Sequence, residues 1–498
     1  MINPILLPLY QSPGMRALEQ AAQAASPPLM EQAGVAAAEF ARELATGKDV
    51  LVLAGPGNNG GDAFEVAVHL KRWFYRVCVV FAGERNKLPP DAAAALAKWE
   101  AAGGVLDETI PAETRFCLVV DGLFGIGLAR PLSGLHADLV QAVNALGVRG
   151  TPVLALDCPS GLDTDTGRAL GSVVRATHTI TFIALKPGLL TLDGPDLCGE
   201  VRVAELGINA EGVAPAQGHL VDSGILALLQ SRPRNFHKGK AGTLGILGGS
   251  TGMVGAALLA GRAALKSGTG KVLLGLLAEQ PPGVDYQQPE LMLRTPQALL
   301  DDDALSALVV GPGLGKRDAA SKALKRALAL ELPLVLDADA LNLIAAERPL
   351  QMALAKRGHP TLLTPHPAEA ARLLHTETAD VQADRIAAAS LLAKRTGALV
   401  VLKGNGSVIA APDGRWWINA SGNPGMASAG MGDVLAGLAG SLLAQGYAAE
   451  SALLLAVYLH GAAADALAGS GSGPVGLTAS EVADGIRSLL NPGVKTAT

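Results

Sequence analysis

Carboxylates and amides follow three strand-like segments in the first half of the chain. The loop 55–62, Gly-Pro-Gly-Asn-Asn-Gly-Gly-Asp, comes directly after the apolar run 49–54. Asp121 and Asp157 each end a similar run, and Ser160 follows Asp157 by three residues. Because ligands of open parallel sheets bind beyond the carboxyl ends of the strands, we expect these side chains to form one site. A carboxylate at such a position must be solvated or bound, which favours a ligand.

These donors suggest what the first site could bind. Oxygen ligands from separate loops, without His or Cys, suit an alkali or alkaline-earth cation rather than a transition metal. The glycines of 125–131 add backbone N–H groups for a phosphate. The glycine spacing in 55–60 also matches a dinucleotide-binding loop, but no His or Tyr completes an evident hydride-transfer site. Taken singly, Asp62 and Ser160 are equally well explained as a helix acid and a turn residue.

A second candidate site lies near the end of the chain. The glycine-rich segment 422–432 leads directly into Asp433 and an apolar helical stretch. Backbone N–H groups at a helix N-terminus bind phosphate, and a carboxylate beside them can deprotonate a hydroxyl. A plain helix cap would explain Asp433 but not the length of the glycine-rich run. The sequence holds no Gly-x-x-x-x-Gly-Lys-Ser/Thr motif, which argues against a P-loop enzyme.

The elements that must position these residues are apolar strands alternating with helical stretches, a pattern typical of parallel α/β sheets. This alternation of strands and helices becomes less clear at 207–218, where we place a linker between domains 1–212 and 219–498. An Asp-Gly turn in 407–425 predicts a hairpin. The expected strands are 49–54, 76–82, 116–121, 151–157 and 177–183, then 242–249, 271–277, 305–311, 332–337, 360–365 and 398–404.

Composition limits the class of protein. The chain has 498 residues, 49% of them hydrophobic, and a net charge of -5 without a basic block. We therefore expect a globular protein whose partners are small molecules, with no nucleic acid and no membrane. Four widely spaced cysteines suit reduced thiols, and we expect a cytoplasmic homo-oligomer. The apolar region 434–464 is interrupted by Gln, Gly and Glu, which fits buried helices better than a bilayer span.

Five segments of the first half carry a resemblance to a known family: MRALEQAA, PLMEQAG, GPGNNGGD, DGLFGIGL and LDCPSGLDTDTG. They resemble the NAD(P)HX epimerases over residues 10–212, which implies a Rossmann-like domain. Ala63 departs from the family's usual Gly, and would strain the loop if its φ were positive. The resemblance implies a potassium ion bound by Asn59, Asp121 and Ser160, with Asp157 catalytic. It implies contacts to the hydrated dinucleotide from Asn58, Asn59, Gly60, Gly61, Asp62, Gly125, Ile126, Gly127, Leu128, Ala129, Arg130, Pro131 and Asp157.

The second half resembles the ADP/ATP-dependent NAD(P)HX dehydratases over residues 220–495. The segments that carry this are HKGKAGTLGILGGSTGMVGAALLAG, LVLDADALN, LLTPHPAEAARLL, VVLKGNGSVIA and GNPGMASAGMGD. The implied fold is ribokinase-like, with Asp433 as the base. Met431 stands where the family usually has Thr or Ser, and His366 could instead be a turn residue. The resemblance implies that Ala257, Gly313, His366 and Asp433 bind the hydrated dinucleotide, and that Lys403, Gly404, Asn405, Gly406, Ser407 and Gly432 bind the adenine nucleotide.

The two resemblances together predict a bifunctional repair enzyme. Its first domain would interconvert the R and S hydrates of NADH and NADPH, and its second would dehydrate the S form with ADP or ATP, together with Mg²⁺. The resemblance to fused bacterial enzymes favours ADP. The alternative is a ribokinase-superfamily vitamin kinase fused to a non-catalytic nucleotide-binding scaffold.

Overall fold

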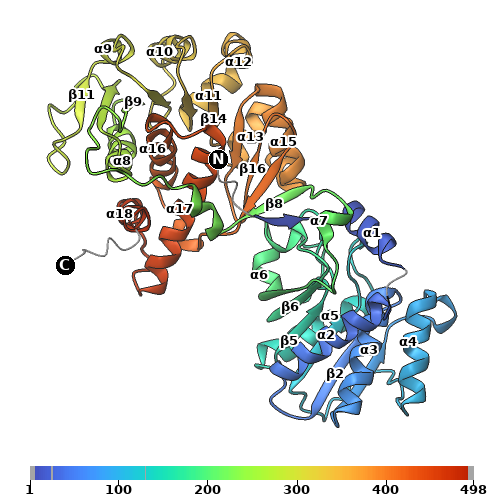
Figure 1. Ribbon diagram of the computed structural model, residues 1–498. Coiled ribbons are helices and arrows are strands. Elements are labelled where there is room, and N and C mark those ends of the chain that lie inside the picture. Colours follow the sequence, from blue (N-terminus) through green and yellow to red (C-terminus); the bar gives the residue numbers. More distant parts are fainter. Residues whose placement is uncertain (1–5, 24–25, 129, 492–498) are drawn as a thin grey trace. The chain divides into compact units, whose positions relative to one another are not determined.

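The computed structural model describes residues 6–23, 26–128 and 130–491. The chain divides into two compact units (Figure 1). The first is Pro8–His219, and the second is Leu220–Thr498 together with the residues before Pro8. Both are α/β, as predicted, and each is described here by itself.

The first unit contains a six-stranded parallel sheet with the order β3-β2-β4-β5-β6-β7. Its strands are β2 (Asp49–Ala54), β3 (Arg76–Phe81), β4 (Leu118–Gly122), β5 (Val153–Leu156), β6 (His178–Phe182) and β7 (Glu200–Ala204). Its helices are α1 (Ser12–Ala21), α2 (Leu29–Leu44), α3 (Asn58–Arg72), α4 (Pro90–Ala101), α5 (Leu135–Val148), α6 (Gly194–Cys198) and α7 (Ala210–Val213).

Both faces of this sheet are buried, which is why its strands read as continuous apolar runs. Val50 and Val52 of β2 belong to the apolar cluster formed with α2 and α3, whereas Leu51 and Leu53 belong to the cluster formed with α5. The chain passes from β2 to β3 on one side and returns to β4 on the other. The strand order therefore reverses between β2 and β4, and a ligand is expected beyond their carboxyl ends.

The second sheet has 11 strands in the order β1-β8-β17-β16-β15-β14-β13-β12-β9-β10-β11, and its strands from β17 to β11 along this order lie wholly in the second unit. The strands from β11 to β15 along this order are parallel, and β15, β16 and β17 are antiparallel neighbours. Residues 411–415 connect β16 to β17, so the hairpin predicted from its Asp-Gly turn is confirmed.

The elements of this sheet and its helices have the following bounds. The strands are β1 (Leu7–Leu9), β8 (Gly218–Val221), β9 (Thr243–Gly248), β10 (Lys271–Leu276), β11 (Met292–Arg294), β12 (Ala307–Val310), β13 (Leu334–Leu336), β14 (Thr361–Leu363), β15 (Leu399–Leu402), β16 (Ser407–Ala410) and β17 (Trp416–Asn419). The helices are α8 (Val254–Lys266), α9 (Pro296–Leu300), α10 (Asp318–Leu328), α11 (Asp339–Ala346), α12 (Arg348–Ala355), α13 (Pro367–Leu374), α14 (Thr378–Ala383), α15 (Arg385–Thr396), α16 (Met431–Ala444), α17 (Ala449–Gly469) and α18 (Ala479–Leu489).

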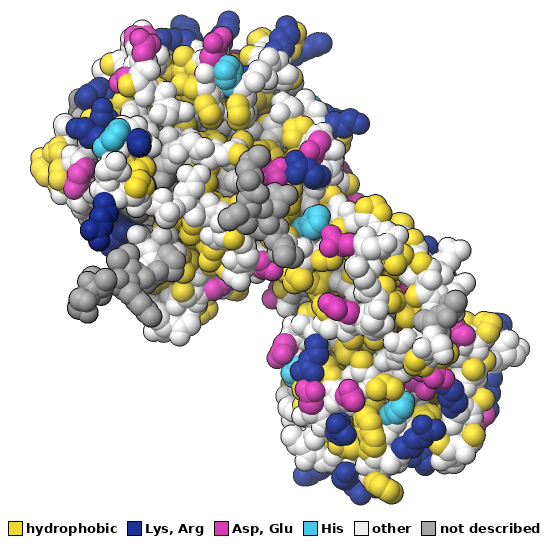
Figure 2. Space-filling view, viewed as in Figure 1, with side chains coloured by type: hydrophobic (Ala, Val, Ile, Leu, Met, Phe, Trp, Pro, Cys, Tyr) yellow, Lys and Arg dark blue, Asp and Glu magenta, His cyan; other side chains and the backbone are white. Residues whose placement is uncertain are grey.

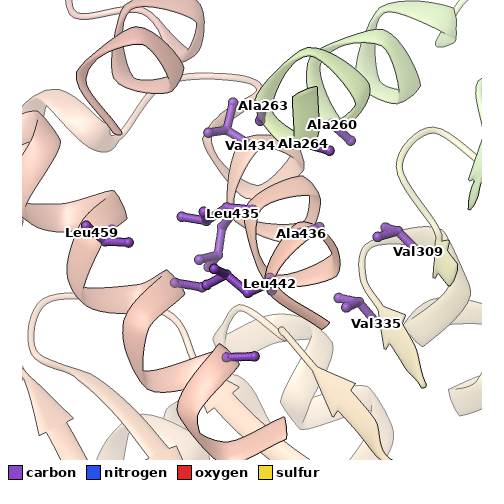
Figure 3. Packing of buried hydrophobic residues seen from close by; sticks show 14 of the residues in the cluster. Ala260, Ala263, Ala264, Val309, Val335, Val434, Leu435, Ala436, Leu442 and Leu459 are labelled. Atoms are coloured by element: carbon purple, nitrogen blue, oxygen red, sulfur yellow. The ribbon is translucent and has the colours of Figure 1, made fainter. Parts of the chain in front are cut away.

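Helix α16, which begins beside the predicted phosphate loop, is held rigidly in the core of this unit. Its residues Val434, Leu435 and Leu442 are buried, and the helix packs against α8, α17 and the sheet (Figure 3). Gly437 permits the close approach to α8, because a Cβ atom there would lie 2.1 Å from the Ala260 carbonyl oxygen. The start of α16 is therefore fixed by packing.

The prediction that residues 207–218 form a linker between domains is wrong, because this segment is part of the first unit. Residues 207–218 contain α7 and the first residue of β8, and the boundary between the units falls after His219. The segment is bound to the beginning of the first unit: the Tyr10 hydroxyl donates to the Ala214 carbonyl at 2.8 Å, and the Gln217 side chain accepts from the Gln11 N–H at 2.7 Å. The segment also packs against the apolar core of the first unit through Ile208, Ala210 and Ala214, so it is part of that unit.

The distribution of surface charge and the longest apolar helix both bear on the expected class of protein. Basic and acidic side chains are interspersed on the face of each unit in view, without a broad area of one sign among the coloured residues (Figure 2). Helix α17 is long and apolar enough to cross a membrane by length and composition, but 61% of its most apolar window is buried inside the protein. It is a core helix that packs against α16 and α18.

Candidate active sites

In the first unit, Asp121 and Ser160 are linked at the carboxyl end of β4. The Ser160 hydroxyl donates to Asp121 Oδ1 at 2.7 Å, and the Ser160 N–H donates to Oδ2 at 2.9 Å. Both residues are fully buried. Burial raises the pKa of Asp121 to about 6, even though the hydrogen bonds from Ser160 and Leu123 oppose that change. The carboxylate is therefore a strong acceptor that lacks a bulk-solvent shell.

Asn59 provides independent evidence of a binding site. The residue is 7% exposed, and both its side-chain oxygen and its side-chain nitrogen are buried without a hydrogen-bond partner. A Cβ atom built on Gly125 would lie 3.4 Å from the Asn59 side chain and 2.9 Å from Asp157 Oδ2. The amide therefore lies beside Asp157 at the same rim. Unsatisfied buried amide atoms cost free energy, so this arrangement is suited to a bound ion or a polar ligand.

Asp157 is held by contacts that define its orientation. Its backbone has a φ of 64°, which is rare for a residue with a side chain and is typically found at functional sites. Lys186 Nζ lies 2.5 Å from Asp157 Oδ1, and Oδ2 accepts from the Ile126 N–H at 3.2 Å. The Lys186 ammonium also donates to the Thr181 hydroxyl and the Phe182 carbonyl, at 2.8 and 2.9 Å. The three N–H groups of the Lys186 ammonium thus all have hydrogen-bond acceptors within the protein.

Two further acids border the same pocket. Burial raises the pKa of Glu19, and the charge of Asp157 adds to the rise. Burial also raises the pKa of Asp62 well above its ordinary range, again with a contribution from Asp157. Groups of this kind can carry a proton near neutral pH. The pocket therefore combines an ion-paired carboxylate with two protonatable ones.

The pocket has a volume of about 430 Å³, and most of the predicted dinucleotide-binding residues border it. Gly60 and Gly61 are buried at the start of α3 instead, and Arg130 and Pro131 are exposed residues outside its lining. Ala129 lies outside the described residues. Ala63 is within α3, where positive φ is not required, so the strain considered for it does not occur. The pocket is lined by Arg16, Glu19, Pro56, Gly57, Asn58, Asn59, Asp62, Leu123, Phe124, Gly125, Ile126, Gly127, Leu128, Asp157, Phe182 and Lys186.

In the second unit, Asp433 is the third residue of α16. The helix is preceded by Gly430, whose φ of 89° makes the turn, and no side chain caps its N-terminus. Asp433 is therefore not the helix cap that the sequence left open. Burial raises its pKa to about 7, and the neighbouring Asp337 adds to the rise while Lys403 opposes it. A carboxylate with this pKa is well matched to general-base catalysis at neutral pH.

Lys403 and Asp337 lie at the N-terminus of α16. Lys403 Nζ is 3.0 Å from Asp337 Oδ1, which also accepts from the Thr364 hydroxyl at 2.7 Å. A Cβ atom built on Gly432 would lie 3.2 Å from Lys403 Nζ and 3.6 Å from Asp337 Oδ2. Backbone N–H groups and an ammonium thus converge beside the Asp433 carboxylate. This combination can bind a phosphoryl group.

The remaining predicted residues lie on neighbouring strand ends of this sheet. Gly404 and Ser407 form a tight turn after β15, in which the Ser407 hydroxyl donates to the Gly404 carbonyl at 3.0 Å. Gly313 follows β12, and Ala257 is buried in α8. His366 caps α13 by accepting from the Ala368 and Glu369 N–H groups, which confirms its structural role as a turn residue. Its ring is exposed, so it is accessible to a ligand as well as capping the helix. Asn405 and Gly406 complete the 403–407 turn.

Sequence reasoning overlooked two functional candidates, Lys186 and Asp337. Lys186 comes from the segment after β6, outside the motifs that the sequence brought forward, so motif reading did not point to it. Asp337 ends the apolar run 332–337, which is the same signal that identified Asp121 and Asp157. Among the described residues, no group of three or more His, Cys, Asp or Glu side chains is placed to hold a metal ion.

The two sites and the two sheets define the class of protein: a chain of two α/β modules, each with a ligand site beyond the carboxyl ends of its strands. A family model described as NAD(P)H-hydrate dehydratase matches residues 244–487, and one described as YjeF-related protein N-terminus matches residues 26–188. The chain is 38% identical to the bifunctional NAD(P)H-hydrate repair enzyme Nnr of Coxiella burnetii, over 97% of this chain and 99% of that relative. It is 38% identical to the Escherichia coli Nnr over 94% and 90% of the two chains. The chain belongs to the family of bifunctional NAD(P)H-hydrate repair enzymes.

Among solved structures, an ADP/ATP-dependent NAD(P)H-hydrate dehydratase of Bacillus subtilis, co-crystallised with ATP and Mg²⁺, is 33% identical to this chain. It covers 54% of this chain and 95% of its own, with a TM-score of 0.47. The curated relatives match both halves together, so the alternative of a vitamin kinase fused to a scaffold is set aside.

Proposed function

We propose that this chain repairs hydrated NADH and NADPH in two steps. The first unit would epimerise the R and S hydrates, and the second would dehydrate the S hydrate at the expense of a nucleotide. The observation that carries the proposal is the position of Asp433: a carboxylate with a pKa of about 7 stands at a helix N-terminus beside Lys403. The family membership supplies the substrate.

In the first unit, Asp157 would act at C6 of the hydrated ring, where a hydroxyl and the ring nitrogen share one carbon. In the ring-opening route, Asp157 accepts the hydroxyl proton as the C6–N1 bond breaks, and Asp62 or Glu19 returns a proton to the nitrogen side. Rotation of the resulting aldehyde and reclosure invert C6. In the alternative route the C6–O bond breaks and water returns to the other face. The raised pKa values of Glu19 and Asp62 support proton donation in either case.

In the second unit, Asp433 would accept the C6 hydroxyl proton as the oxygen attacks the terminal phosphoryl group of the nucleotide. The nucleotide product would be AMP if ADP is the phosphoryl donor, and ADP if ATP is the donor. The C6–O bond then breaks with phosphate as the leaving group, a proton is lost from C5, and the C5–C6 double bond of NADH or NADPH is restored. Lys403 and the N–H groups at the start of α16 would bind the transferred phosphoryl group.

Potassium fits the first site. Asn59 has a buried side-chain oxygen without a partner, and the Asp121 carboxylate and the Ser160 hydroxyl are buried hard donors. When bound, the ion would supply positive charge near the dinucleotide. Magnesium and the adenine nucleotide would bind in the second site, where the carboxylates of Asp337, Glu369 and Asp433 all act on Lys403. The preference for ADP, the cytoplasmic location and a homo-oligomeric state remain predictions from the sequence.

Separated R and S hydrates provide the test. Each is incubated with ADP, with ATP or without nucleotide, while absorbance near 340 nm reports NADH formation and chromatography reports the epimers. The S hydrate should give NADH only with a nucleotide, and the R hydrate should exchange to S without one. Absence of nucleotide-dependent NADH formation would contradict the proposal for the second unit.

A further inference from the structure

The loop that connects β17 to α16 is bound along one stripe of α17. This loop, residues 420–430, leads into the N-terminus at which the phosphoryl group would bind. Tyr458, Gly461 and Asp465 of α17 are spaced i, i+3 and i+7, so they lie on one face of the helix. All three contact the first half of the loop.

The individual contacts are specific to the loop backbone. Asp465 accepts from the Gly422 N–H at 2.7 Å and from the Asn423 side-chain amide at 3.0 Å. Asn423 in turn accepts from the Gly425 N–H at 3.0 Å, so one carboxylate fixes two successive turns of the loop. The Ser421 hydroxyl donates to the Tyr458 carbonyl at 3.2 Å.

Gly461 brings the loop into direct contact with the helix. A Cβ atom built on this residue would lie 2.4 Å from the Ser421 hydroxyl oxygen and 2.5 Å from the Ser421 carbonyl oxygen. Only glycine permits this approach. Next to it, His460 is 7% exposed and lies against the backbone of Met431, the first residue of α16. Helix α17 therefore contacts the loop at its beginning and at its end.

Such anchoring bears on nucleotide binding because a loop of 11 residues with glycines at 422, 425 and 430 loses conformational entropy when it is ordered around a ligand. Contacts already present in the free protein reduce that cost on binding and keep the N–H donors aligned during phosphoryl transfer. Asp465 is exposed, whereas Gly461 is buried and Tyr458 is partly buried. Its carboxylate can therefore be removed without creating a cavity.

We propose that Asp465 is a positioning residue for the nucleotide site, which it orders through the 420–430 loop. This inference rests on the proposed nucleotide-dependent dehydration. It predicts that loss of Asp465 weakens nucleotide binding and phosphoryl transfer, while binding of the hydrate and epimerisation are unaffected.

The test compares the full chain with Asp465→Ala and Asp465→Asn, and uses Asp301→Ala as a matched control. Asp301 is another exposed aspartate of the same unit, but it pairs with Arg326 away from the loop. ADP binding is measured by calorimetry without hydrate, and dehydration is measured as separate kcat and KM values for ADP and for the S hydrate. Asp465→Ala should raise the Kd and KM for ADP about tenfold, as expected for loss of hydrogen bonds to a charged acceptor. Asp465→Asn, which keeps one acceptor oxygen, should show a smaller change, and Asp301→Ala should resemble the wild type.

The outcomes separate the two proposals. Wild-type ADP affinity and kcat in Asp465→Ala would overturn the positioning role, and so would an equal rise of KM for the hydrate, since this would indicate general damage to the unit. If the wild type binds ADP but does not dehydrate the hydrate, the proposed function fails while the binding comparison still decides the role of Asp465. If the wild type binds neither ADP nor ATP, both are overturned.

Discussion

Each unit places an aspartate near a buried lysine, but the two lysines act differently. In the first unit Lys186 is 1% exposed, and its three protons are used by Asp157, Thr181 and Phe182. In the second unit Lys403 pairs with Asp337 rather than with Asp433, and its side chain is 23% exposed. Lys186 is a fixed part of the structure, whereas Lys403 faces the place where a phosphoryl group would bind.

The difference has a chemical consequence. In the first site Asp157 pairs directly with Lys186, and burial raises the pKa values of the neighbouring Glu19 and Asp62. In the second site burial raises the pKa of Asp433 to about 7, with the charge of Asp337 adding to the rise and Lys403 opposing it, so Asp433 can exchange its proton at neutral pH. The first site thus places two carboxyl groups with raised pKa values beside an ion pair, whereas the second places one such group at a helix N-terminus.

Removal of the Asp433 carboxylate is expected to have the largest effect. Asp433→Asn retains the size of the side chain but cannot accept the hydroxyl proton, so dehydration should fall by roughly 10² to 10⁴. Epimerisation should persist, since Asp433 lies in the other unit. The reciprocal Asp157→Asn should slow exchange of R to S and leave turnover of pure S hydrate near normal. Both activities are measured on both variants, with thermal melting to verify folding; loss of both activities in one folded variant would contradict two independent sites.

Removal of the lysines should affect stability unequally. Lys186→Met leaves the Asp157 charge buried without its partner, and breaking a buried pair in this way costs about 3 to 5 kcal/mol. Lys403→Met should cost less because its side chain is partly exposed. Denaturant unfolding of both variants measures which of them loses more free energy of unfolding. The double variant Lys186→Met with Asp157→Asn should recover stability without recovering epimerisation; if the single variant is as stable as the wild type, the ion pair is not the fixed element inferred here.

The pH dependence of dehydration tests the role of Asp433 as base. Because its pKa is raised to about 7, the active carboxylate is depleted below that pH, and kcat/KM should fall about tenfold per pH unit there. Lys403 lowers this pKa, so Lys403→Met should move the midpoint to higher pH. A kcat/KM for dehydration that stays constant from pH 5 to 8 would exclude Asp433 as the titrating base.

The smallest expected effect concerns potassium in the first unit. Ionised Asp121 is the form that would bind a cation, and its pKa is raised to about 6. Without the ion, this raised pKa means that stability is lost as pH rises from about 4 through 6; the ion should offset that loss above pH 6. Thermal melting is compared in potassium and in a bulky organic cation at pH 5 and 7.5, with Asp121→Asn as the control. Equal melting temperatures and equal epimerisation rates in both salts would remove potassium from the site.

Much of the fold was predictable because a buried strand can be recognised from its own sequence. The expected strands 49–54 and 271–277 agree closely with β2 and β10, since segments covered on both faces must be apolar throughout. The strands β1, β7, β8 and β11 were not predicted. They have three to five residues each, so the sequence offers little length over which a pattern could stand out.

For the sites, the sequence by itself determined which residues stand at strand ends and helix starts, because strand length and glycine-rich turns are local properties. Asp121, Asp157 and Asp433 were identified in this way. Tertiary structure alone decided that Lys186 pairs with Asp157 and that Lys403 pairs with Asp337. It also decided the pKa of Asp433, because burial and the charges of neighbours come from segments that are brought together only when the sheet forms.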